Sequence, residues 1–143
     1  MATIANSIST RGTASAEAGL LPLLGRILIA AIFVLSGISK LTAPAGTIAY
    51  IQSAGLPAPT LAYGIALAVE LGGGLLLIAG YRTRLVAGIL AAFAFATAFG
   101  FHSNLADQNQ FIHFFKNVAM AGGLLQVVAF GGGRLSLDRK LRI

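Results

Sequence analysis

The sequence predicts an all-α membrane protein, a bundle of four transmembrane helices joined by short loops. Only 10% of its 143 residues are charged and 57% are apolar, with a mean hydropathy of +0.85, whereas soluble domains carry about 25% charged residues. The apolar residues also gather in four stretches, each close to the ~20 residues that cross a bilayer as a helix. We therefore expect one compact domain that is embedded in lipid.

Residues 1–18 are rich in Ser, Thr and Ala without a sustained apolar period, which predicts a flexible cytoplasmic tail. The first span follows at about 20–41, and Pro22 stands near its start, where a missing N–H costs little. A cleaved signal peptide with its cleavage site at 43–45 is the alternative. Against it, the leader would be unusually long and Lys40 would lie close to the cut.

A connector broken by three prolines follows the first span, and it is compatible with a short interfacial helix that holds Tyr50 at headgroup level. The later spans are separated by a tight turn at 80–84 and a polar segment at 102–110. The predicted units are spans at about 60–79, 85–101 and 111–130, a transmembrane domain over 19–132, and a basic cytoplasmic tail over 133–143.

The ten Lys and Arg residues are distributed unequally between the two sides of such a bundle. Eight lie at or near the side that holds both termini: Arg11, Arg26, Arg82, Arg84, Arg134, Arg139, Lys140 and Arg142. The other side has only Lys40 and Lys116. The positive-inside rule therefore places both termini in the cytoplasm of a bacterial inner membrane. Because the cations flank apolar runs instead of forming one stripe, nucleic acid is not an expected partner.

Small residues recur every four positions in three of the spans, and such rows let helix backbones approach closely in lipid. The predicted helix-packing residues are Gly64, Ala68 and Gly72, then Gly88, Ala92, Ala96 and Gly100, and finally Ala119 and Gly123. A ligand path is the alternative for these rows. A homo-oligomer built on them is compatible with the sequence.

Glu70 lies roughly 15 Å deep in the second span, near the bilayer midplane. A carboxylate at that depth is expected to face the bundle interior beside a cation. Depth along the spans favours Arg26 and Lys116 as its partners, while Lys40 lies closer to the surface and is the weaker candidate. This intramembrane cluster either fixes helix assembly as an ion pair or contacts a substrate, a quinone headgroup or a proton path.

A second polar cluster is predicted near the outer face. Its members are Lys40, His102, Asp107, His113 and Asn117, with Lys116 beside them. His113, Lys116 and Asn117 are three and four residues apart and share one helix face. The cluster could bind an anion or a quinone carbonyl or relay protons, and the alternative is an interfacial polar rim.

Several chemistries have no residues to support them. The sequence has no Cys, which excludes thiol catalysis, thiolate zinc sites and cysteine-ligated iron–sulfur clusters. Two histidines make a poor metal or haem site, and no P-loop, dinucleotide fingerprint or Ser–His–Asp arrangement is present. We expect no metal and no certain cofactor, with quinone as the candidate ligand.

The order and spacing of these segments resemble the DoxX family over most of residues 25–138. The matching segments are GRILIAAIFVLSGISKL (25–41), AGTIAYIQSAGLPAP (45–59), VELGGGLLLIAGYRTRLVA (69–87), FH…FFKNVAMAGGLL (101–125) and GRLSLD (133–138). The resemblance implies a four-helix inner-membrane protein. The family positions that it carries over are Gly25, Arg26, Ser36, Gly37, Lys40, Glu70, Thr83, Arg84, His102, Lys116 and Asn117.

The resemblance also implies a redox context, since some relatives are subunits of thiosulfate–quinone oxidoreductases and others are membrane partners of redox-defence enzymes. One hypothesis is thus a membrane subunit or scaffold for a redox enzyme, with no catalysis by the chain alone. The second is a carrier of protons or a small solute that uses Glu70. A purely structural membrane protein is the third.

Overall fold

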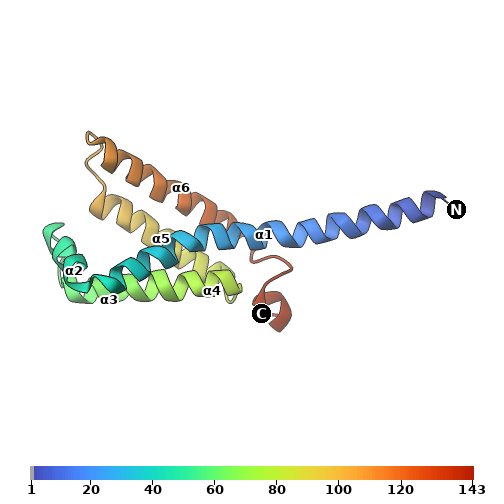
Figure 1. Cartoon of the computed structure of the whole chain (residues 1–143), viewed down its shortest axis with the longest axis horizontal. Helices are drawn as coiled ribbons and strands as arrows, with labels where there is room; N and C mark the ends of the chain where they lie inside the picture. The colour runs from blue at the N-terminus through green and yellow to red at the C-terminus, as the bar shows by residue number, and fades with distance from the viewer. Residues whose placement is uncertain (1) are drawn as a thin grey trace.

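The computed structural model describes the backbone of residues 2–143 and the side chains of residues 19–143. Over this range the chain forms helices joined by short turns, as Figure 1 shows. The elements are α1 (Ala2–Thr42), α2 (Pro44–Ser53), α3 (Pro59–Leu67), the π-helix η1 (Ala68–Gly73), α4 (Gly74–Ala79), α5 (Thr83–Phe101), α6 (Gln108–Phe130) and α7 (Leu137–Leu141). The predicted all-α fold class is confirmed.

Four helical stretches within the described residues are long and apolar enough to cross a membrane: Gly19–Thr42, Pro59–Ala79, Thr83–Phe101 and Gln108–Phe130. They differ from the predicted spans by one to three residues at the N-terminal end and by at most one residue at the C-terminal end. The second stretch consists of α3, η1 and α4, which follow one another without a break. A short helix, α2, does form between the first two spans.

The N-terminal part of α1 projects beyond the other helices (Figure 1). The backbone is helical from Ala2 onward, so the segment predicted as a flexible tail continues the first span as helix. The side chains of residues 1–18 lie outside the described residues, and the cytoplasmic location of this segment stays a prediction.

Two pairs of helices build the bundle. Helix α5 runs along α6, and α1 packs against α4 and η1 (Figure 1). Small and branched side chains fill the core: Ala30, Phe33, Leu77, Val86, Ala87, Leu90, Ala91, Ala94, Ala121 and Leu124. Many large apolar side chains lie on the outside, including Leu28, Leu61 and Phe130. An exposed apolar surface around a tight core is the arrangement that lipid requires.

The predicted small-residue rows mostly do not pack the helices of one chain together. Gly64, Ala68, Gly72, Ala92, Ala96, Gly100 and Ala119 are exposed. Gly88 and Gly123 are half-buried, and a methyl group added at Gly123 would lie 3.1 Å from Ile29 Cδ1. Most of these residues therefore do not pack helices within one chain, and a role between chains stays a prediction.

Helix geometry explains the outcome in α5, where Gly88 is half-buried and Ala92, Ala96 and Gly100 are exposed. A strict four-residue row turns by about 40° at each step, because each residue advances about 100° around the helix. Such a row winds away from the contact face within three steps. The buried small residues of α5 are instead Ala87, Ala91, Ala94 and Ala98, spaced four, three and four apart, which keeps them on one face.

Arg26 joins α1 to the two segments at one end of the bundle. It is 1% exposed, and its guanidinium donates to the carbonyls of Leu77 and Ile78 at 2.9 Å and to the carbonyl of Leu135. The first two carbonyls belong to the last turn of α4, where helix geometry leaves carbonyls without intrahelical partners and the dipole favours a cation. Arg26 therefore holds the end of the second span and the C-terminal segment.

Asp138 attaches α7 to the start of α5. Its carboxylate accepts hydrogen bonds from the backbone N–H groups of Arg82 at 2.6 Å and Thr83 at 2.8 Å, and its own N–H donates to Gly80 O at 2.9 Å. Burial opposes ionisation of Asp138, but hydrogen bonds from Thr83 and Arg82 and the charge of Arg26 outweigh it, so the pKa of this carboxyl is lowered. The predicted basic tail is thus docked on the bundle.

We expect Asp138→Asn to lower stability at neutral pH by about 1 kcal/mol, because the amide loses the charge that complements the two N–H groups. A carboxyl whose pKa is lowered by folding stabilises the protein above its usual value of 3.8, and this contribution is lost as the pH falls through the lowered pKa. The melting temperatures of the parent and Asp138→Asn, measured in detergent by circular dichroism, should therefore differ at pH 7 and become equal in strong acid.

Asp107→Asn is the matched control for this measurement. Asp107 is the N-cap of α6 and accepts from Gln110 N–H at 2.9 Å. Asn caps helices about as well as Asp, so this control should melt close to the parent protein. Equal losses in the two variants would contradict the role given to Asp138.

Candidate functional site

A cavity of about 760 Å³ opens between the spans at the end of the bundle opposite Arg26. We call it the central cavity. Its polar lining comes from α1, η1, the end of α5 and α6: Ser36, Lys40, Glu70, His102, His113, Lys116 and Asn117. The structure therefore brings together, in one cavity, residues that the sequence placed in two separate clusters.

Glu70 is 5% exposed, and its partner is Lys40. Lys40 Nζ lies 2.9 Å from both carboxylate oxygens, donates to Oε1, and donates to Ser36 Oγ at 2.8 Å. Ser36 Oγ in turn donates to Glu70 Oε1 at 3.2 Å. Oε2 is buried, lies next to the Lys40 ammonium and receives no aligned hydrogen bond.

The expectation that Arg26 or Lys116 pairs with Glu70 was wrong. One rule explains the direction in which the side chains of Arg26, Lys40 and Lys116 point. Side chains on a helix lean toward its N-terminus. In α1 this carries Lys40 one turn inward, past Ser36 to Glu70, and carries Arg26 away from the centre to the carbonyls of α4. In α6 it carries Lys116 back toward His113, three residues earlier.

Close helix approach and an irregular turn position Glu70. A methyl group added at Gly37 of α1 would lie 2.6 Å from Leu71 Cγ and 3.3 Å from Leu71 N, so only glycine permits this contact. Glu70 itself lies within η1, the π-helical stretch of the second span. Single π turns inside α-helices are frequent at functional sites, because the wider turn redirects side chains.

The two histidines stack on each other at the mouth of the central cavity. The rings of His102 and His113 are 5.0 Å apart with an interplanar angle of 25°. His102 Nδ1 lies 3.0 Å from Gln110 Oε1, and His113 Nδ1 lies 2.9 Å from Lys116 Nζ. Because an ammonium group only donates, His113 Nδ1 is the acceptor in this contact and its Nε2 carries the proton.

Asn117 and Asp107, the other members of the predicted outer cluster, have different positions. Asn117 is buried, donates to His113 O at 3.0 Å and lines the cavity. Asp107 is exposed and serves as the cap of α6, outside the cavity lining, so its inclusion in the cluster was wrong.

The sequence analysis did not identify most of the apolar and hydroxyl-bearing residues that line the central cavity. These residues are Ile32, Phe33, Thr47, Tyr50, Ile51, Ile65, Phe93, Thr97 and Met120. The ring of Tyr50 stacks on Phe101 with centroids 5.5 Å apart, which joins α2 to the end of α5. Helix α2 closes one side of the cavity, with Ile51 buried.

The chemistry of the cavity suits a flat amphiphilic molecule. Ammonium, imidazole and amide groups can donate to carbonyl oxygens, while the carboxylate of Glu70 can accept from a hydroxyl. The apolar wall favours a ring or an alkyl chain, as in most small-molecule sites, where a few polar groups fix the orientation of the ligand.

Comparison with known proteins agrees with this architecture. The sequence model of the DoxX family matches residues 21–103, and that of the SURF4 family matches residues 65–143. The chain is 39% identical over 119 residues to inner membrane protein YqjF of Escherichia coli (strain K12), covering 83% of this chain and 90% of the relative. It is 35% identical over 123 residues to inner membrane protein YphA of the same organism, covering 82% and 88%. No solved structure gives a significant match.

Proposed function

We propose that this chain, which belongs to the DoxX family, binds a quinone headgroup in the central cavity as the membrane subunit of a redox system. The observation that carries the proposal is the pair of buried Glu70 and half-buried Lys40 in the lining of an otherwise largely apolar cavity. A quinone offers carbonyl oxygens that accept, and its reduced form offers hydroxyls that donate. The cavity contains groups of both kinds beside a wall that suits the ring and isoprenoid chain.

The residues divide this task by position. Lys40 and Ser36 hold the carboxylate of Glu70, which lines the cavity and would accept from a quinol hydroxyl. On the facing helix, Lys116 and Asn117 supply N–H donors for a carbonyl oxygen. A separate redox enzyme would exchange electrons with the bound quinone, and this chain would bind and orient the ring.

The proposed location is the inner membrane, with both termini in the cytoplasm. Two similar proteins, YqjF and YphA, carry the name of inner membrane proteins. The end of the bundle formed by residues 80–84 and 131–143 holds six Lys and Arg residues, and the positive-inside rule puts such an end in the cytoplasm. The central cavity would then open toward the outer half of the bilayer.

The test measures binding of a benzoquinone with one isoprenoid unit to the full chain in lipid nanodiscs by saturation-transfer NMR and isothermal titration. We expect saturable binding of the quinone and its quinol. Glu70→Gln should weaken quinol binding at least tenfold, because a charge-assisted hydrogen bond is roughly twice as strong as a neutral one.

Gln126→Ala is the matched control, since Gln126 is exposed on α6 and does not line the cavity. It should bind as the parent does. Absence of saturable binding to the parent protein, or equal quinol affinities for the parent and Glu70→Gln, would contradict the proposal.

A proton or small-solute carrier is the second candidate. It is favoured by the polar lining of the cavity, which extends from Glu70 in the second span to the two histidines at the end of α5 and near the start of α6. In liposomes this function predicts a pH-driven flux that Glu70→Gln abolishes while the protein still inserts. If neither quinone binding nor flux is found, the structural role remains.

A further inference from the structure

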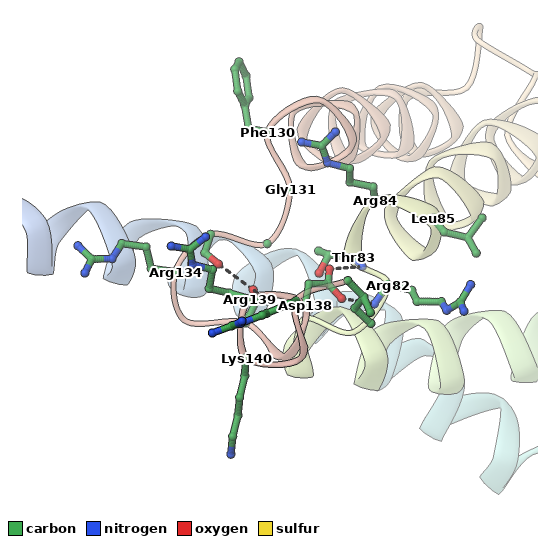
Figure 2. A pocket seen from close by; sticks show the side chains of 15 residues that line it. Arg82, Thr83, Arg84, Leu85, Phe130, Gly131, Arg134, Asp138, Arg139 and Lys140 are labelled. Carbon is green, nitrogen blue, oxygen red and sulfur yellow. Dashed lines mark hydrogen bonds between the residues drawn. The ribbon is translucent and has the colours of Figure 1, made fainter.

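The opposite end of the bundle holds a second, larger hollow of about 1400 Å³, which we call the basic cavity. Figure 2 shows it between the start of α5, the end of α6 and the C-terminal segment. Its cationic lining residues are Arg82, Arg84, Arg134, Arg139, Lys140 and Arg142. Among the described residues that line it, Asp138 is the one acid.

Asp138 does little to neutralise these cations. Both of its carboxylate oxygens accept from backbone N–H groups at the start of α5, and its negative charge also interacts with the charge of Arg26. The carboxylate is therefore used to dock α7 on the bundle. Arg134 has a partner of its own, and the other five cationic side chains still outnumber the one acid among the described residues that line the cavity.

The cationic side chains spread around the docked segment instead of meeting at one point. Figure 2 shows Arg82 and Arg134 directed to opposite sides and Lys140 directed away from both. Arg84 lies along Gly131, where an added methyl group would be 3.4 Å from Arg84 Nε. A single small anion would contact few of these groups, whereas a ligand with more than one anionic group, or several ligands side by side, would engage them together.

Apolar side chains lie next to the cations on the same rim. Leu85, Phe130 and Ile143 are 58%, 77% and 65% exposed, and all three line the basic cavity. Leu85 and Phe130 stand on the two spans α5 and α6, so they lie where the acyl chains of a bilayer would begin. Exposed apolar groups beside a cationic surface indicate an amphiphile whose head is anionic.

We propose that the basic cavity is a binding site for anionic phospholipid, with the phosphodiester at the arginines of α5 and the C-terminal segment and the acyl chains along Leu85 and Phe130. A lipid with two phosphodiesters fits the spread of the cations best. The docking of α7 by Asp138 makes this a built surface, because it holds the helix that carries Arg139 and Lys140 against the bundle. The site is independent of the quinone proposal, since the two cavities lie at opposite ends.

The test is native mass spectrometry of the full chain, purified in mild detergent, delipidated, and titrated with tetraoleoyl cardiolipin, dioleoyl phosphatidylglycerol or dioleoyl phosphatidylcholine. We expect the affinity to fall in that order. Arg84→Gln and Arg139→Gln should each weaken phosphatidylglycerol binding about fivefold, as expected for one basic residue near a lipid surface. The difference between the lipids should shrink in 0.5 M ammonium acetate because salt screens exposed charges.

Lys116→Gln is the matched control, because it removes the same charge at the other end of the bundle. Circular dichroism of each variant checks that the helices form. Because Arg139 is exposed on α7, its substitution should disturb the packing of the protein little. Equal affinity for phosphatidylcholine, or equal losses in Arg139→Gln and Lys116→Gln, would overturn the proposal. Displacement of the lipid by millimolar inorganic phosphate would also overturn it and assign the cavity to free phosphate.

Discussion

Replacing Lys40 by methionine is expected to destabilise the protein by about 3 kcal/mol, which is the low end of the range for breaking a buried ion pair. Glu70 would be left in the second span without its cation, and Ser36 alone cannot compensate the carboxylate. The side chain of Lys40 is 24% exposed against 6% for Glu70, so some water reaches the pair and moderates the loss. The measurement is the midpoint of unfolding in mixed micelles of dodecyl maltoside and sodium dodecyl sulfate.

A double variant separates the charge from the packing. Lys40→Met with Glu70→Gln removes both charges, so it should recover at least half of the stability lost in the single variant. Lys116→Met is the control, because Lys116 is exposed and bonds His113 rather than Glu70. If Lys40→Met and Lys116→Met unfold at the same midpoint, the pair does not carry the energy assigned to it.

Arg26→Met is the second substitution with a large expected effect, a loss of about 3–5 kcal/mol. The guanidinium is 1% exposed and donates to the carbonyls of Leu77, Ile78 and Leu135. Methionine would fill part of the volume but would take the side-chain donor from all three carbonyls, of which Leu77 O keeps the backbone N–H of Gly80 at 3.2 Å. Each buried group left unpaired costs about 1–3 kcal/mol. The same micelle unfolding assay measures the change.

Arg26→Lys tests the geometry of this contact. A lysine keeps the charge but lacks the planar fork that reaches three carbonyls, so its stability should lie between those of the parent and Arg26→Met. Arg82→Met serves as the control because Arg82 is exposed at the same end of the bundle. A parent-like midpoint for Arg26→Met would show that the carbonyls find other partners.

The span positions could be predicted from the sequence because they depend on one local property, the length of an apolar run. Thr83 and Phe101 bound the third span two residues from its predicted start and at its predicted end. The face that each span buries depends on helix phase and was predicted less well. In the second span Ala66, Glu70 and Gly74 are buried while Gly64 and Gly72 are exposed, so Glu70 itself was the reliable marker of the inner face.

For the site, residue types were predictable but pairings were not. A carboxylate in the middle of a span has few tolerable environments, which is why Glu70 could be expected to face inward. Which cation pairs with Glu70 depends on the direction in which the side chains lean. Lys40 and Arg26 both lean toward the N-terminus of α1, which brings Lys40 to Glu70 and takes Arg26 away from it. The contact of Asp138 depends on the fold of the C-terminal segment, which no local pattern encodes.

The position of Arg26 has a consequence for how the protein is made. Leu135 follows Arg26 by 109 residues, so a ribosome makes the first span long before the last of the carbonyl partners of Arg26. Until then Nη2 of Arg26, which donates to Leu135, depends on water, on headgroups or on the insertion machinery. The order of synthesis thus leaves the bundle open at this end until the C-terminal segment emerges, and its arrival completes the assembly.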